Sequence, residues 1–430
     1  MKDIKKNISP ENNPFDKTRL FNYVKTFSFP RLAGTEGERS AVDLTYKTFN
    51  KIGFNKSQIF KQSFKFSDFY STTFIQLISM MSLTFILFLF FFGYIYFFIK
   101  FLFIGIMAIL VHLIYISIKY PEDPGFWGEY FGNTLDATNV FVKLPAKMNN
   151  ERGNIIISAH LDSKSQTFRT IWRIIFYEVW LFSGIIFGIF YIIQIVYVEL
   201  IRFSIALPIT IQIFNYEFLF IDPFIWITVV FISISNIALM FLYTDNKSPG
   251  ANDNASGMAI VFALSDYFKD CPLHNYNLWF CQFSAEELGT MGSRFFVKEF
   301  ENTLKEYKTF QINFDMVSAP GKKNNCVQYI KSYGLLPRKK LCPILGKYFE
   351  NEAFSENISI KTFNLATGAH TDTVPFHLRG YEAIDIITFN AIKFAHNKTD
   401  TPDKVDPEIL SNACKIAKNV ILKLDNDYES

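Results

Sequence analysis

Two long hydrophobic blocks interrupt the mixed apolar and polar pattern of this 430-residue chain. The first block runs from about Ser71 to Ile118, and Lys100 is its only formal charge. The second block runs from about Ile171 to Tyr243. A helix needs about 20 apolar residues to cross the hydrocarbon core of a bilayer. Each block therefore predicts a hairpin of two membrane-spanning helices.

The limits of the spans follow from the charges and prolines within each block. The expected spans are Thr73–Tyr96, Phe101–Ile118, the segment between Glu178 and Glu199, and Pro223–Leu242. The sequence predicts a tight turn near Lys100 in the first block. The apolar segment Phe203–Tyr216 is too short for a span and contains Pro208, so we expect it to lie in the membrane interface or to re-enter.

An even number of crossings in each block places all the polar segments on one side of the membrane. Positive residues near span ends favour the cytoplasmic side. On the side of the polar segments the sequence has Lys61, Lys65, Lys119, Lys164, Arg169 and Arg173. The opposite turns carry only Lys100 and Arg202. The sequence thus predicts a multi-pass membrane protein with its polar segments in the cytoplasm.

The polar segments alternate between strand-like and helix-like patterns. The expected strands are Gly153–His160, Asn277–Glu287, Lys308–Asp315 and Ala383–Asn390. The expected helices are Gly37–Lys51, Ser256–Phe268, Thr290–Glu301, Leu335–Glu350 and Pro407–Leu424. Nearly continuous apolar strands indicate a sheet that is buried on both faces. This pattern predicts a three-layer α/β/α sandwich on a mostly parallel mixed sheet.

The predicted domain organisation is one polar domain with two insertions. Its three parts are residues 1–70, 119–170 and 244–430, and the transmembrane hairpins are residues 71–118 and 171–243. The first 20 residues contain no apolar core, so we expect no cleaved signal peptide.

Charge and cysteine content narrow the class of protein. The net charge of +3 is too small to indicate nucleic-acid binding. The five cysteines form no CxxC pair and are odd in number, so no disulfide framework is expected and a reducing compartment is favoured.

Side chains that commonly bind metals lie at the ends of the four predicted strands and in one loop. They are His160, Asp253, Glu286, Glu287, Asp315 and His396. Because the carboxyl ends of parallel strands form the sites of open α/β sheets, we expect these side chains to converge. A single pair such as His160–Asp162 is common by chance. The evidence for a metal site is that all six side chains lie at strand ends or in one loop.

This set of side chains is suited to zinc chemistry. Two histidines and several carboxylates without cysteine suit Zn²⁺ or a close substitute. A carboxylate can bridge two ions, and Asp253 is placed for this role on a loop. Of the adjacent Glu286 and Glu287, one can bind metal while the other acts as general base.

The motifs that carry these residues resemble those of the M28 family of metallopeptidases, in the order of that family. The opening is RLAGTEGERSAVDLTYKTFNKIGF, and the site motifs are AHLDS, GANDNASGMA, SAEELGTMGS, NFDMVS and HNKTDTPDKVD. The resemblance implies a zinc exopeptidase-like fold with two zinc ions per chain. It implies His160 and Asp315 as ligands of one ion, Glu287 and His396 as ligands of the other, Asp253 as the bridge, Glu286 as the general base, Asp162 as the partner that orients His160, and Asp400 as a similar support near His396.

The function implied is that of a membrane-anchored, zinc-dependent exopeptidase, an aminopeptidase that hydrolyses peptide substrates with a metal-activated water. The chain departs from the family pattern in two respects. Membrane blocks interrupt the peptidase sequence, and the ends of the second must lie close together if His160 and Asp253 are to meet. In TDTVPFHLRG, Thr373 stands where many members have histidine, near His370 and His377. This region shapes the substrate pocket.

Two other functions are compatible with these motifs. Glutaminyl cyclases share the fold and use a single zinc ion, so a metal count per chain would distinguish them. A non-catalytic membrane receptor built on a peptidase-like domain is the other alternative. Such proteins typically lose metal ligands, whereas all of them are present in this sequence.

Overall fold

The computed structural model describes residues 13–91, 97–119, 122, 128, 130–147, 153–319, 326–334, 338–365 and 371–428. The chain divides into two compact units. Unit 1 consists of Met1–Asp68, Asn133–Arg169 and Thr244–Ser430, and unit 2 consists of Phe69–Gly132 and Thr170–Tyr243. Unit 2 is therefore made of two segments inserted into the sequence of unit 1.

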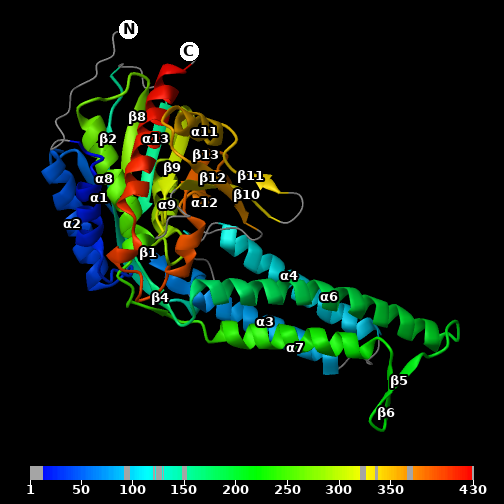
Figure 1. The fold of residues 1–430 in the computed structure, drawn as a ribbon. Helices are drawn as coiled ribbons and strands as arrows, with labels where there is room; N and C mark the ends of the chain where they lie inside the picture. Colours follow the sequence, from blue (N-terminus) through cyan, green and yellow to red (C-terminus); the bar gives the residue numbers. More distant parts are fainter. Residues whose placement is uncertain are drawn as a thin grey trace. The chain divides into compact units, whose positions relative to one another are not determined.

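Unit 1 is built on a mixed sheet that has nine strands among the described residues (Figure 1). Along the sheet the order is β1 (Ile59–Ser67), β2 (Thr134–Leu144), β8 (Tyr276–Phe283), β3 (Gly153–His160), β9 (Lys308–Phe314), β13 (Glu382–Ile386), β10 (Val327–Tyr333) and β11 (Lys339–Lys340), and β12 (Ile360–Leu365) also pairs with β10. The central strands β8, β3, β9 and β13 are parallel, and β1, β2, β10 and β11 add antiparallel pairs. The predicted mixed sheet is confirmed, and its central strands are parallel.

Helices cover both faces of this sheet. One face packs against α1 (Lys17–Phe27), α2 (Glu36–Ile52), α8 (Ser256–Lys269), α11 (Leu345–Ser355) and α13 (Pro407–Asn426). The other packs against α9 (Met291–Glu299), α10 (Glu301–Glu306) and α12 (Val374–Leu378). Along β3, Ile155 and Ile157 join the first core and Ile156 the second. Alternate side chains thus enter opposite cores, and the predicted sandwich is confirmed.

Local signals explain where several helices begin and end. The Asp16 carboxylate accepts hydrogen bonds from the backbone N–H groups of Thr18 (2.9 Å) and Arg19 (3.1 Å) and caps α1. α13 begins with Pro407 after the cap Asp406. The helix expected over Leu335–Glu350 starts only at Leu345, because Pro343 disfavours helix in the residue before it. The first three residues of the expected helix, 335–337, lie outside the described part of the chain.

Both insertions leave and re-enter unit 1 at paired strands. The first lies between β1 and β2, where Ser67 pairs with Thr134. The second lies between two short antiparallel strands, β4 (Ser165–Gln166) and β7 (Thr244–Asp245). The ends of the second insertion therefore meet, as the sequence argument requires.

The described part of unit 2 contains four long helices, α3 (Thr72–Phe91), α4 (Phe97–Lys119), α6 (Thr170–Arg202) and α7 (Asp222–Met240). Of these, α3, α6 and α7 are long and apolar enough to cross a membrane, and Phe98–Leu113 of α4 forms a shorter apolar helix. Hydrogen bonds to the Ser82 hydroxyl from Trp180 Nε1 (2.9 Å) and Asn236 Nδ2 (3.1 Å) join α3, α6 and α7. Polar side chains of this kind stabilise helix contacts in an apolar setting.

Two details of unit 2 concern the segments near Lys100 and Pro208. Lys100 lies in the first turn of α4, and the residues 92–96 where the predicted turn would fall lie outside the described part of the chain. The Lys100 ammonium lies 5.8 Å from the centre of the Tyr191 ring. A cation–π contact of this kind lets a buried lysine remain within a helix. The segment Phe203–Tyr216 contains β5 (Thr210–Ile213), which forms a β-hairpin with the following strand β6 (Tyr216–Leu219).

The close contact of α8 with β9 gives a first prediction. A Cβ added at Gly257 would lie 2.2 Å from the Phe314 carbonyl oxygen and 2.5 Å from Asn254 Oδ1. We expect Gly257→Ala to lower the free energy of unfolding by about 1–3 kcal/mol, because the helix must move away from the sheet. The measurement is the thermal unfolding temperature of the purified chain in detergent. Gly184→Ala on α6 is the control, since a Cβ there meets nothing within 4 Å. Equal unfolding temperatures for both variants would contradict the prediction.

Candidate metal centre

The predicted ligand residues converge at the carboxyl ends of the parallel strands. Among the described residues, two groups of three side chains place their ligand atoms within 4.8 Å of one another. The first group is His160, Asp253 and Asp315, and the second group is Asp253, Glu287 and His396. Asp253 belongs to both groups.

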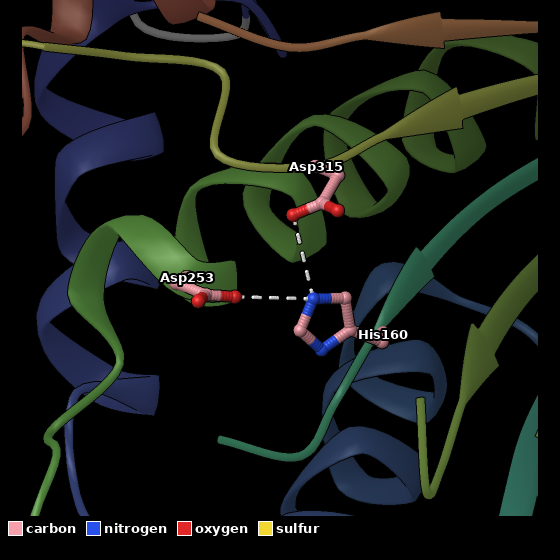
Figure 2. A group of neighbouring side chains, drawn as sticks. All are labelled: His160, Asp253 and Asp315. Carbon is pink, nitrogen blue, oxygen red and sulfur yellow. Dashed lines mark ion pairs between the residues drawn. The ribbon is translucent and has the colours of Figure 1, made fainter. Parts of the chain in front are cut away.

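The first group surrounds one nitrogen of a buried histidine. His160 ends β3, Asp253 lies in the loop before α8, and Asp315 follows β9 (Figure 2). The Nε2 atom of His160 lies 3.2 Å from Asp253 Oδ1 and 3.4 Å from Asp315 Oδ1. The Nδ1 atom is 3.1 Å from the Asp162 carbonyl oxygen. The Nε2 atom therefore faces two carboxylate oxygens, an arrangement that a bound cation or protonation of the imidazole would stabilise.

The second group uses the other oxygen of Asp253. The Nε2 atom of His396 lies 3.3 Å from Asp253 Oδ2 and 2.9 Å from Glu287 Oε2. Asp253 therefore directs one carboxylate oxygen toward each histidine. This is the geometry that a carboxylate needs to contact two cations at once.

The buried ligand atoms fit metal ions. His160 Nε2, Asp315 Oδ1 and Glu287 Oε1 are buried and form no hydrogen bond within the described residues. Buried polar atoms are normally satisfied, so each such atom needs an explanation. A cation in the first group would satisfy His160 Nε2 and Asp315 Oδ1. Carboxylate and imidazole donors without thiolates are the ligands of catalytic zinc.

The adjacent carboxyl groups of Glu286 and Glu287 have opposite electrostatic environments. Burial raises the pKa of Glu286 well above its ordinary value, and Glu287 and Asp315 raise it further while His160 lowers it. Burial also acts to raise the pKa of Glu287, but His396 and Lys164 hold it well below its usual range. Glu286 Oε2 is 3.9 Å from His160 Nε2, and Glu286 belongs to neither metal group. Pairs whose pKa values are pushed apart commonly divide acid–base and ligand roles.

Left-handed backbone conformations adjoin the ligands. Ala285, Met316 and His396 have φ values of 58°, 47° and 59°. Ala285 precedes the Glu286–Glu287 pair, and Met316 follows Asp315. Such conformations are costly for residues other than glycine and gather at functional sites.

Asp162 supports the centre in two ways. Its carbonyl oxygen contacts His160 Nδ1, while its carboxylate Oδ1 lies 3.5 Å from the same nitrogen. The carboxylate accepts hydrogen bonds from the backbone N–H groups of Glu286 (3.1 Å) and Glu287 (3.2 Å). Asp162 thus positions the glutamate pair as well as the histidine.

Asp400 supports a different ligand from the one expected. Its carboxylate accepts hydrogen bonds from the backbone N–H groups of Asn252 (2.9 Å) and Asp253 (3.0 Å), so it holds the bridging loop and not the His396 segment. Asn254 was not among the predicted site residues, and its Nδ2 donates to the Phe314 carbonyl (2.8 Å). That bond ties the Asp253 loop to β9.

Arg31 is the most extensively bonded residue that the sequence argument missed. It is fully buried and donates hydrogen bonds to the carbonyl oxygens of Leu161 (2.6 Å), Pro249 (2.7 Å) and Gly250 (2.8 Å). Burial lowers its pKa to about 10. Leu161 follows His160, and Gly250 precedes the Asp253 loop, so one guanidinium joins the two motifs that flank the second insertion.

Thr373 lies beside a cavity of about 200 Å³ that also contacts Lys339, His377 and Asp385. The hydroxyl groups of Thr371 and Thr373 donate to Asp385 Oδ2 at 2.6 and 2.8 Å. His377 lies in α12, and His370 lies outside the described residues.

Comparisons with known proteins find similar peptidases. The family model described as peptidase family M28 matches residues 238–421. The chain is 28% identical to aminopeptidase YwaD of Bacillus subtilis over 173 residues, which cover 39% of this chain and 36% of that protein. The matched part of the chain thus spans about a third of that relative.

Two solved structures share the fold. BSAP, a zinc aminopeptidase from Bacillus subtilis, matches with a TM-score of 0.53 and 13% identity, covering 96% of this chain and 95% of that one. Fimbriiglobus ruber glutaminyl cyclase matches with a TM-score of 0.53 and 14% identity, covering 95% of each chain. Likeness at this identity establishes the fold alone. Together with the sequence match of residues 238–421, it shows that the chain resembles the peptidases of family M28 in fold and in the C-terminal part of its sequence.

Proposed function

We propose that the chain is a membrane-anchored, zinc-dependent exopeptidase, an aminopeptidase that acts on peptide substrates. The proposal rests on the orientation of the Asp253 carboxylate. Its Oδ1 atom faces His160, and its Oδ2 atom faces His396. The proposed metal ligands of two zinc ions are His160, Asp253, Glu287, Asp315 and His396. Glu286 is the proposed general base, and Asp162 is the proposed positioning residue.

The proposed chemistry assigns separate tasks to the metals and to the protein. Two bound zinc ions would supply Lewis-acid polarisation of the peptide carbonyl and would acidify water. The Glu286 carboxylate would accept the proton of the attacking water and deliver it to the leaving amine. Asp162 would hold Glu286 in place through the backbone hydrogen bond of 3.1 Å.

The apolar surface of unit 2 supports the proposed membrane anchoring. Exposed side chains along its helices include Ile189 (54% exposed) and Ile192 (64%) on α6 and Ile227 (56%) on α7. A surface of this kind is stable against lipid tails and not against water. We propose that α3, α4, α6 and α7 form two transmembrane hairpins within one polar domain. The excess of Lys and Arg near the polar segments favours the cytoplasmic side for unit 1.

A glutaminyl cyclase remains the alternative enzyme, since one of the similar structures carries that name. The two ligand groups that share Asp253 favour the peptidase, because a single zinc ion would leave the other group without a cation. Two zinc ions per chain in the purified protein would support the peptidase.

An assay on a panel of peptides tests the proposed function and gives a second prediction. We expect release of the N-terminal residue from a free peptide and from its C-terminally blocked form. An N-terminally acetylated form should not be cleaved. A chelator should abolish the activity, and added Zn²⁺ should restore it. Cleavage of only the acetylated form, or cyclisation of N-terminal Gln without hydrolysis, would overturn the proposal.

A further inference from the structure

A buried lysine contacts a ligand of the second metal group. Lys164 follows the AHLDS motif, and its side chain is only 10% exposed. Its Nζ atom lies 2.9 Å from Glu287 Oε2 and donates to the Glu287 carbonyl oxygen at 2.8 Å. The same Oε2 atom faces His396 Nε2 at 2.9 Å. The Lys164 ammonium group therefore contacts the same Glu287 oxygen that faces His396.

No comparable contact is made to the first group within the described residues. The hydrogen bonds described for Arg31, another buried cation, go to backbone carbonyl oxygens, including those of Leu161 and Gly250. Lys164 also acts on His396, where its charge is among the causes that lower the pKa of the imidazole. A positive charge thus lies against Glu287, one of the two ligands that are unique to the second group.

The residues on either side of Lys164 are hydrogen-bonded to the segment that follows the second insertion. Ser163 Oγ donates to the Ser248 carbonyl (3.1 Å), and Ser165 Oγ donates to the Asp245 carbonyl (2.8 Å). The backbone on both sides of Lys164 is therefore fixed to the returning strand. Gln166 N–H in turn donates to the His396 carbonyl (3.2 Å). These bonds fix the position from which the Lys164 side chain reaches Glu287.

We propose that Lys164 makes the two metal groups unequal. The first group, His160, Asp253 and Asp315, binds its zinc ion tightly, and the second group binds its ion at least about tenfold more weakly because a unit charge lies within a few ångströms of the dication. The inference rests on the proposed two-zinc peptidase. In this proposal the second zinc ion exchanges with the solution. The concentration of free zinc then determines what fraction of the enzyme holds both ions.

Zinc binding to the full chain in detergent tests the proposal without any peptide. Zn²⁺ is titrated against a chromophoric chelator of known affinity, and zinc retained after dialysis is counted by elemental analysis. The wild type should show two steps separated by tenfold or more. Lys164→Met and Lys164→Gln should tighten the weaker step at least tenfold, whereas Lys164→Arg should leave the two steps separated. Lys247→Met is the control, because Lys247 is exposed and pairs with Asp245.

The outcomes distinguish this inference from the proposed function. Two zinc ions bound with one affinity by the wild type would overturn the inequality and leave the peptidase proposal intact. A weaker or unchanged second step in both uncharged variants would show that Lys164 does not oppose the second ion. Failure of the wild type to bind any zinc would instead overturn the proposed function. If the uncharged variants do not fold, the wild-type titration still decides whether the groups are unequal.

Discussion

Glu286→Gln should lower kcat for peptide hydrolysis by about 10²- to 10⁴-fold, the usual contribution of a general base. Glutamine has nearly the same shape as glutamate but cannot accept a proton. Glu286 lies outside both metal groups, and its backbone N–H is held by Asp162. The variant should therefore keep its fold and both zinc ions while losing turnover.

The neighbouring residue provides the matched control for this experiment. Glu287→Gln should lower the zinc content, because Glu287 is a member of the second group. Turnover and zinc content are measured on the same samples of both variants. A Glu286→Gln enzyme with wild-type turnover and full zinc content would show that another group removes the proton.

The positions of the ligands were predictable because each depends on a local pattern. An apolar run marked β3 and alternating apolar residues marked β9, and His160 ends the first strand while Asp315 follows the second. The parallel packing of these strands then brings both side chains to one edge of the sheet. To predict where these side chains lie, one needs only the positions of the strands and their parallel direction, and the sequence indicates both.

The supporting residues were not predictable because their partners are distant in the sequence. A single arginine in RLAGTEG is typical of a surface loop, yet Arg31 is buried among carbonyl groups from segments near residues 161 and 250. Asp400 follows His396 closely in sequence, but the backbone N–H groups that it binds belong to Asn252 and Asp253. Local patterns contain no information on which distant carbonyl or amide lies beside a side chain.

The insertion points explain how a metal centre tolerates hydrophobic segments within its own sequence. β4 pairs with β7, so the chain leaves and re-enters unit 1 at adjacent residues such as Ser165 and Asp245. Arg31 joins the flanking Leu161 and Gly250 carbonyl groups by a second route. These bonds fix the distance between the His160 and Asp253 motifs, whatever the length of the segment between them. Insertions at such positions conserve the local geometry of the host.

Asp253→Asn should remove zinc from both groups at once, which a ligand of a single ion cannot do. Zinc concentrations that saturate the wild type should leave less than about one ion on the variant, because an amide nitrogen replaces a charged oxygen between two cations. Elemental analysis after gel filtration measures the loss. Asp315→Asn and Glu287→Gln serve as comparisons, since each belongs to only one group and should cost only one ion.

The control for this experiment is Asp245→Asn, because Asp245 lies in β7 at the end of the second insertion and its side chain is 47% exposed. It should bind zinc as the wild type does. An unfolding temperature of Asp253→Asn close to that of the zinc-free wild type would show that the loss of zinc does not come from a damaged fold. If Asp253→Asn kept one tightly bound ion, the two oxygens of Asp253 would not be shared between the groups. The bridge, and with it the two-metal peptidase, would then be wrong, because the geometry of the second group depends on the oxygen that Asp253 directs toward His396.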